Sequence, residues 1–264
     1  MSFLQKLDNL PAFHHVVKAL RLRDAAGAML RRFPRVRHLP KTGAVYRCRY
    51  LETLLLADEL FKRNVYLKAI DPAKVQTFAD LGANVGLFAV LLLEMTGRRD
   101  LRGLMIDANP EMIAETTWHL DQNRLPGVKP VHGLAGSAST GESVDFFILP
   151  SNLGSSQFAV YEPGKPPKGE WKKISVPRVD LETAWLRDVG DVRCHFCKID
   201  IEGSEKQLLQ TDQRFLARVD TIILEWHKWI AQREELDKML ADQGFRLVEV
   251  LEDLAQTGIA WYAR

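Results

Sequence analysis

A short stretch with two glycines, residues 78–88, constrains the fold of this chain more than any other part of its sequence. It reads Phe-Ala-Asp-Leu-Gly-Ala-Asn-Val-Gly-Leu-Phe, so a short apolar segment ends at an acid and a second apolar segment follows the glycines. Gly82 and Gly86 permit a tight turn from a strand into a helix, whose first N–H groups can face a ligand. The stretch therefore predicts a strand–turn–helix unit with a ligand at the turn.

The ligand expected at this turn carries positive charge. In the G-x-G-x-x-G turns that bind dinucleotides, the middle glycine lets the pyrophosphate approach bare backbone, but Asn84 stands at that position here. Asp80, at the carboxyl end of the strand, would repel a diphosphate and attract ammonium and sulfonium groups. The pattern favours S-adenosylmethionine over NAD, with Asp80, Gly82, Asn84 and Gly86 as cofactor-binding residues.

Composition is consistent with a globular enzyme. The chain has 264 residues, of which 46% are hydrophobic, and can bury the core of one large domain with a modest extension. It lacks both a run of about 18 apolar residues and the layout of a secretory signal. The cysteines, Cys48, Cys194 and Cys197, include one C-x-x-C pair but no second pair to complete a zinc site. We expect a cytoplasmic protein whose cysteines are small buried residues.

The order of apolar segments predicts an α/β fold. Residues 2–32 read as one or two amphipathic helices, followed by a loop through Pro34 and Pro40, a strand at 45–49 and a helix at 51–63. Strands are then predicted at 77–81, 103–107, 128–134, 143–149, 172–176, 195–201, 221–226, 245–251 and 258–263, and helices at 86–95, 110–123, 180–185, 205–210 and 230–243. This alternation is typical of a doubly wound, mostly parallel sheet, closed here by an antiparallel strand pair at the C-terminal end.

Positive charge is concentrated at the N-terminal end. Residues 1–70 contain 14 Lys and Arg against 5 Asp and Glu, a net charge of +9, and the remaining residues contain 22 against 29, a net charge of −7. The excess is densest from Arg21 to Arg49. Such a run indicates either a solvated face or a surface for an anionic partner, and no interleaved aromatic residues favour nucleic acid as that partner. The N-terminal helices are also the expected site of any homo-oligomer contact.

Two further residues are placed beside the cofactor. Asp107 ends the strand that follows the glycine turn, where a carboxylate can accept hydrogen bonds from both ribose hydroxyls of an adenosine. Because Asn109 and Pro110 begin a helix directly after it, Asp107 could also belong to that turn alone. Ala135, in the loop after the third strand, is expected beside the adenine.

Charged side chains follow two of the predicted central strands. Lys198, Asp200 and Glu202 alternate along one strand end, and Glu225 and His227 share a face of the next. Strands buried in a parallel sheet are normally apolar on both faces, so these charges indicate a ligand crevice. If the two strands are neighbours, the acids and the imidazole converge. The alternative is helix capping and salt bridging, in which Lys198 would take part.

These motifs resemble those of FkbM-type methyltransferases, in the family's order and over about residues 50–250. The matching segments are Asp80-Leu-Gly-Ala-Asn-Val-Gly86, Asp107-Ala-Asn-Pro110, Asn152-Leu-Gly-Ser-Ser156, Lys198-Ile-Asp-Ile-Glu-Gly-Ser-Glu205 and Ile223-Leu-Glu-Trp-His227. The resemblance implies a class I, Rossmann-like methyltransferase domain over residues 51–264, preceded by a basic helical extension over residues 1–50. It also implies O-methylation of a sugar, glycolipid or other secondary-metabolite-like acceptor, with Asn152, Ser155 and Ser156 as acceptor-binding residues. The family commonly has Glu where this chain has Asp107.

The acceptor hydroxyl needs a base, and the catalytic candidates are Asp200, Glu202, Glu225 and His227. His227 has the most suitable ordinary pKa, whereas the first two acids lie in the more specific motif. The same acids suit a divalent cation, but we expect catalysis without a metal. Two other functions are kept open: an RNA 2′-O-methyltransferase that uses the basic N-terminal region, and a non-catalytic module on the same fold.

Overall fold

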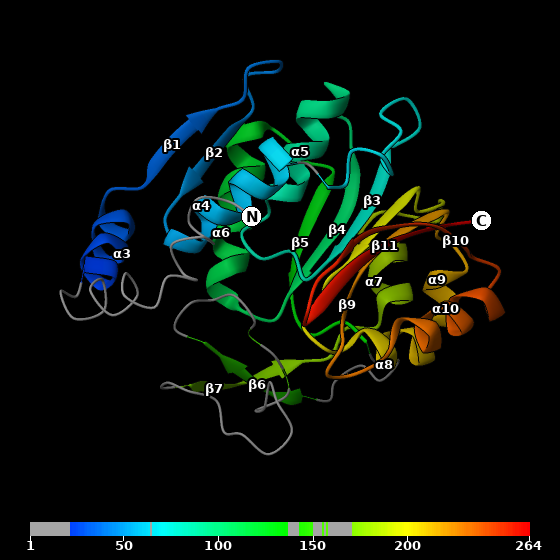
Figure 1. The fold of residues 1–264 in the computed structure, drawn as a ribbon. Coiled ribbons are helices and arrows are strands. Elements are labelled where there is room, and N and C mark those ends of the chain that lie inside the picture. Colours follow the sequence, from blue (N-terminus) through cyan, green and yellow to red (C-terminus); the bar gives the residue numbers. More distant parts are fainter. Residues whose placement is uncertain (1–21, 64, 137–142, 150–154, 156, 158–170) are drawn as a thin grey trace.

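The computed structural model describes residues 22–63, 65–136, 143–149, 155, 157 and 171–264. The helices predicted before residue 22 and the predicted acceptor residues Asn152 and Ser156 lie outside this part. The centre of the molecule is a seven-stranded sheet with the order β10-β11-β9-β8-β3-β4-β5 (Figure 1).

The sheet has the predicted mixture of strand directions. Five strands are parallel: β3 (Thr77–Leu81), β4 (Arg102–Asp107), β5 (Val128–His132), β8 (Phe196–Ile199) and β9 (Thr221–His227). The strands β10 (Arg246–Asp253) and β11 (Thr257–Ala263) form the antiparallel pair, and β11 pairs with β9. The chain reverses its winding direction between β3 and β8, and at such a point a crevice opens outside the carboxyl ends of the strands.

Helices cover both faces of the sheet. One face carries α4 (Leu51–Asp58), α5 (Leu87–Thr96) and α6 (Pro110–Asn123), and the other carries α7 (Leu181–Asp188), α8 (Glu205–Thr211), α9 (Gln213–Leu216) and α10 (Arg233–Asp242). Neighbouring residues of β3 show the division, because Phe78 packs into the first layer and Ala79 into the second. The short helix α9 was not predicted.

The segment before the sheet differs from the prediction. After α3 (Leu22–Arg32), the expected loop contains β1 (Arg35–His38), which forms an antiparallel hairpin with β2 (Val45–Cys48). Gly43, with φ +70°, supplies the turn that brings the two strands together. The helix predicted at 51–63 changes at Glu59 into a π-helix, η1 (Glu59–Arg63).

A second, two-stranded sheet lies beside the ends of the parallel strands. It consists of β6 (Ser143–Ile148) and β7 (Lys172–Pro177), and it packs through Phe146 and Val176 onto Ala108 and Leu134 (Figure 1). Among the described residues, no helix combines the length and apolar character needed to cross a membrane.

Candidate functional site

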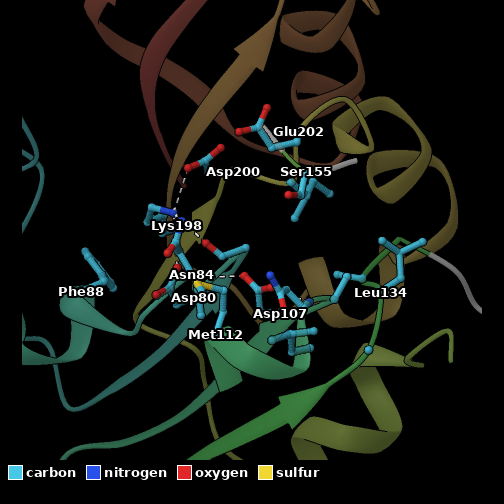
Figure 2. Close-up of a pocket in the computed structure, with 18 of the residues that line it drawn as sticks. Asp80, Asn84, Phe88, Asp107, Met112, Leu134, Ser155, Lys198, Asp200 and Glu202 are labelled. Atoms are coloured by element: carbon cyan, nitrogen blue, oxygen red, sulfur yellow. Dashed lines mark hydrogen bonds and ion pairs between the residues drawn. The ribbon is translucent and has the colours of Figure 1, made fainter. Parts of the chain in front are cut away.

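A solvent-open cavity of about 870 Å³ lies at the carboxyl ends of β3, β4 and β8. Figure 2 shows Asp80, Asn84 and Asp107 on one side of it and Asp200 and Glu202 on the other. These residues come from the three motifs that the sequence singled out, so the topology brings the predicted cofactor and catalytic residues to one site.

The glycine turn is shaped by close backbone approach. Gly82 has φ +83°, and a Cβ atom added there would lie 1.7 Å from the carbonyl oxygen of Asp200. Gly86 has φ +81°, and its added Cβ would lie 2.8 Å from Cγ2 of Thr116. Because Gly82 touches the backbone of the catalytic motif, the two motifs fix each other's position.

The backbone N–H groups of this turn are already used within the protein. Those of Gly82 and Ala83 donate to the carbonyl of Ile106, and that of Asn84 donates to Asp107 Oδ2. Val85 donates to Asn84 Oδ1, and Gly86 donates to the Ala83 carbonyl. The carboxylates around the turn therefore remain the principal groups that can recognise a ligand there.

Asp80 fits a cationic ligand. The residue is 1% exposed, and neither carboxylate oxygen has a hydrogen-bond partner in the described structure. Burial raises the pKa of Asp80 to about 6, although the ammonium of Lys198, 3.4 Å from Oδ1, opposes this rise. A ligand with its own positive charge would supply the compensation that the buried acid lacks, as the sequence predicted for S-adenosylmethionine.

Asp107 belongs to the turn before α6, one of the two roles that the sequence left open, and it also lines the cavity. Its Oδ2 accepts the N–H of Asn84 at 2.7 Å, and its Oδ1 accepts the N–H of Asn109 at 2.7 Å. The carboxylate thus joins the glycine turn to the start of α6, whose N-cap is Asn109. Because it also lines the cavity, its remaining lone pairs can accept ribose hydroxyls. Burial raises its pKa to about 6, against the effect of these two N–H groups. Ala135 lines the same cavity.

Lys198 is the buried cation between the two sides of the cavity. Its Nζ lies 3.3 Å from Asp200 Oδ2, 3.3 Å from the Gly82 carbonyl and 3.4 Å from Asp80 Oδ1 (Figure 2). Burial alone would lower its pKa, but Asp200 and Asp80 outweigh it and hold the pKa well above its usual value. Lys198 therefore forms the salt bridges that the sequence offered as an alternative role, and it forms them inside the site.

Asp200 and Glu202 do not lie on the strand where they were predicted. β8 ends at Ile199, and the chain turns so sharply that Glu202 has φ +50°, the left-handed region. The expected alternation along a strand is wrong here, but the turn still directs both carboxylates to the cavity. A non-glycine residue in this conformation is strained, and such strain is often retained at functional sites. Burial raises the pKa of Glu202.

β8 and β9 are neighbours, as the convergence of acids required. His227, at the end of β9, is 4% exposed; its Nε2 lies 3.1 Å from Glu202 and its Nδ1 lies 3.0 Å from Glu205. Burial alone would lower its pKa, but these two carboxylates outweigh it and raise the pKa to about 11. The ordinary histidine pKa assumed from the sequence does not apply, and His227 holds a proton at neutral pH.

Burial raises the pKa of Glu225 well above its usual value, with a further contribution from Asp200.

Three of these side chains could also hold a metal ion. Asp200, Glu202 and His227 each offer one ligand atom, and these atoms lie within 4.8 Å of one another. A cation there would displace the proton between His227 and Glu202.

Ser155, one of the predicted acceptor residues, lines the cavity together with Phe146. Ser155 Oγ accepts the N–H of Leu149 at 3.1 Å, and the nearby Gln157 donates from Nε2 to Ser204 Oγ at 2.8 Å. The segment that carries the predicted acceptor motif therefore contacts the turn that carries Asp200 and Glu202.

Sequence reasoning missed several residues of the site. Leu56 of α4 and Leu60 of η1 line the cavity. The sequence contains no signal for the π-helix that carries Leu60. Glu205 accepts the N–H groups of Ile201 and Gly203 as well as the His227 proton. Its place directly after Gly-Ser at a helix start is a signal for such a role.

Comparisons with known proteins show the family of this chain. Residues 80–247, more than half of the chain, match the Methyltransferase FkbM domain. A search of curated proteins finds no match. Among solved structures, the chain is similar to a SAM dependent methyltransferase from Aquifex aeolicus (13% identity, 78% of this chain and 91% of that chain, TM-score 0.45). It is also similar to Methyltransferase FkbM from Methylobacillus flagellatus KT (15% identity, 72% and 43%, TM-score 0.46) and to Aeropyrum pernix fibrillarin with natively bound S-adenosyl-L-methionine (12% identity, 88% and 83%, TM-score 0.49).

The domain match contains the glycine turn, Asp107 and the turn after β8, which line the cavity, and also the end of β9, where His227 contacts Glu202. The chain belongs to the FkbM methyltransferase family and is an S-adenosylmethionine-dependent methyltransferase.

Proposed function

We propose that the chain methylates a hydroxyl oxygen of a sugar, glycolipid or other secondary-metabolite-like acceptor. The observation that carries this proposal is the pair Asp200 and Glu202, which face Asp80 and Asp107 across one cavity. An alcohol must lose its proton as its oxygen is methylated, and a carboxylate beside that oxygen can take it. The same proposal includes an N-terminal extension over residues 1–50 and a catalytic domain over residues 51–264. It also includes a cytoplasmic location, which suits the three free cysteines.

S-adenosylmethionine would supply a methyl carbon that its sulfonium group activates. The bond from that carbon to sulfur would break, and the sulfur would keep both electrons in the product, S-adenosylhomocysteine. In this proposal Asp80, Gly82, Asn84, Gly86, Asp107 and Ala135 hold the cofactor, and the segment of Asn152, Ser155 and Ser156 contacts the acceptor. The acceptor oxygen forms the new O–C bond with one of its lone pairs. As the proton leaves, the electron pair of the O–H bond becomes a lone pair on that oxygen. Leu56, Leu60 and Phe146 give the cavity apolar walls against which the reacting groups are oriented.

Glu202 is the base that the geometry favours. Its carboxylate faces the cavity, and burial raises its pKa, which makes it a better proton acceptor. His227 already holds a proton, so in this proposal it donates to Glu202 and fixes its orientation, while Glu205 orients the imidazole. Glu225 and Asp200 set the local field, and Asp200 also keeps Lys198 in place.

The test is transfer of labelled methyl groups from S-adenosylmethionine into a cell extract, followed by separation into lipid, glycan, small-molecule and nucleic-acid pools. We expect label in one of the first three pools. Glu202→Gln should lower kcat about 10²- to 10⁴-fold while cofactor affinity measured by calorimetry is kept. Glu234→Gln, an exposed acid on α10, is the matched control.

The other outcomes separate the alternatives. Label in RNA would favour the RNA 2′-O-methyltransferase, and cofactor binding without labelling of any pool would favour a non-catalytic module. A chelator that abolished transfer would assign Asp200, Glu202 and His227 to a metal ion instead of a proton relay.

A further inference from the structure

Residues 29–38 form an exposed segment in which arginines alternate with apolar side chains. It runs from the last turn of α3 through Pro34 into β1. Met29 is 59% exposed, Phe33 is 66% exposed and Val36 is 49% exposed. These are among the most exposed large apolar residues of the described structure, and they lie within eight residues of one another in the chain. We call residues 29–38 the basic-apolar segment.

Its arginines differ from those farther along the hairpin. Arg31, Arg32, Arg35 and Arg37 are exposed, and none forms an ion pair with a residue in the described part of the chain. By contrast, Arg47 and Arg49 of the same basic region pair with buried Glu115 at 2.8 and 3.0 Å. Of these six arginines, two therefore hold the hairpin in place and four present their charge to solvent.

The chemistry of the segment fits a bilayer surface better than other partners. Guanidinium groups bind phosphates strongly, and apolar side chains interleaved with them can enter the boundary between headgroups and acyl chains. A second copy of the chain would bring the same unpaired arginines against one another about a two-fold axis. Nucleic acid would use the arginines but would leave Met29 and Val36 exposed, and Phe33 is the one aromatic ring in the segment.

The basic-apolar segment is also connected to the cavity. Helix α3 contacts α4, where a Cβ atom added at Gly27 would lie 4.0 Å from Leu51 Cδ1. The same helix α4 contributes Leu56 to the cavity wall, and η1 that continues it contributes Leu60. Figure 1 shows α3 and β1 at one end of the molecule and α7 to α10 at the other. A surface bound to α3 and β1 would therefore lie on the side of the molecule where α4 borders the cavity.

We propose that the basic-apolar segment docks the protein on the surface of a bilayer that contains anionic phospholipids. Phosphates of the headgroups pair with Arg31, Arg32, Arg35 and Arg37, and Met29 and Phe33, which lie one helical turn apart, enter the interface. The proposal concerns attachment alone, so it stands independently of the acceptor and of the base proposed above.

The test is vesicle flotation of the full chain with two vesicle compositions, phosphatidylcholine alone and phosphatidylcholine mixed with anionic phosphatidylglycerol. We expect binding to the anionic vesicles only, weakened by added salt because the arginine charges become screened. Replacing Arg31, Arg32, Arg35 and Arg37 by Ala should lower the partition coefficient at least about tenfold. Phe33→Ser should lower it at every salt concentration, because the apolar contribution is not screened.

A matched variant controls for net charge. Replacing Arg187, Arg214, Lys238 and Arg246 by Ala removes the same charge from exposed positions on α7, α9, α10 and β10. It should bind vesicles as the unmodified protein does. Circular dichroism of each variant checks that it is folded, and Phe33→Ser provides a second test if the quadruple variant fails to fold.

Four results would overturn the proposal: no binding to anionic vesicles, equal binding to both compositions, unchanged binding by both segment variants, or an equal loss in the matched variant. A dimer in light scattering that Phe33→Ser dissociates, without vesicle binding, would assign the segment to a second copy of the chain. Binding of RNA without vesicle binding would assign it to nucleic acid.

Discussion

At the scale of single residues, the cavity is defined by buried charges that are not balanced by their own neighbours. Asp80 has no hydrogen-bond partner in the described structure, and Lys198 must be shared between Asp80 and Asp200. The result is a net negative site at the point where a sulfonium and an ammonium would lie. Binding of the cofactor should therefore depend on the protonation of these acids.

We predict that S-adenosylmethionine binds about tenfold more weakly at pH 5 than at pH 7.5. The pKa values of Asp80 and Asp107 are both about 6, so below that pH these acids are neutral and attract the cationic cofactor less. Calorimetry across this pH range checks the prediction. Asp80→Asn should bind weakly at both pH values, whereas Asp121→Asn, on the exposed side of α6, should behave as the unmodified protein. A pH-independent affinity would contradict this assignment.

Asp107 should affect both binding and stability, because it contacts Asn84 and Asn109 as well as the cavity. We predict that Asp107→Ala weakens S-adenosylhomocysteine binding by about 1–3 kcal/mol and lowers the unfolding free energy by about 1–3 kcal/mol. Calorimetry and urea unfolding measure the two effects separately. Loss of stability with unchanged affinity would assign Asp107 to the turn alone.

At the scale of elements, the β1–β2 hairpin is joined to the cofactor turn through α6. The N–H of Arg47 donates to His119 Nε2 at 2.9 Å, and His119 Nδ1 hydrogen-bonds the Val85 carbonyl at 2.7 Å. One neutral tautomer, with its proton on Nδ1, satisfies both contacts, and burial lowers the pKa of His119 in agreement with it. The Arg47 guanidinium, 4.1 Å from the Trp118 ring, strengthens the same attachment.

We predict that His119→Ala lowers the unfolding free energy by about 2–4 kcal/mol, because a buried side chain and two hydrogen bonds are lost. Cofactor affinity should also fall, since Val85 belongs to the glycine turn. Urea unfolding and calorimetry measure the two effects, and Thr117→Ala, an exposed position on the same helix, is the control. Unchanged affinity in a destabilised variant would limit the hairpin to a structural role.

At the scale of the whole molecule, the two halves of the sheet meet at the cavity, and His227 with its two glutamates joins β9 to the turn after β8. The pKa of His227 is raised to about 11 by Glu202 and Glu205. A histidine whose pKa is raised on folding contributes stability that is fully present below its unfolded pKa of about 6.5 and is lost as pH rises toward its folded pKa. The protein should therefore lose stability from about pH 6.5 to about pH 11.

This prediction is checked by urea unfolding between pH 6 and pH 10 in the presence of a chelator. His227→Gln should be less stable at pH 6 and should show a flatter pH dependence than the unmodified protein. Because Lys and Tyr residues also titrate at high pH, the difference between the two proteins is the measured quantity. Parallel curves would show that His227 is neutral in the folded state.

Much of the fold could be predicted because local patterns and tertiary structure agree. The strand at 77–81 and the helix at 110–123 have the predicted bounds, since one is short and apolar between turns and the other has both an Asn109 cap and Pro110 at its first position. The strand β1 was missed because its pairing with β2 depends on contacts with α6 that no local pattern contains.

The sequence by itself determined the residue types and the turns: the acid and glycines at the end of β3, the helix start after Asp107, the acids after β8 and the acid near the end of β9. Tertiary structure alone decided their chemistry. The burial of Asp80, the left-handed turn at Glu202 and the placement of His227 between two carboxylates set which groups hold protons. The physical reason is that a pKa depends on burial and on charges a few ångströms away, and residues far apart in sequence supply both.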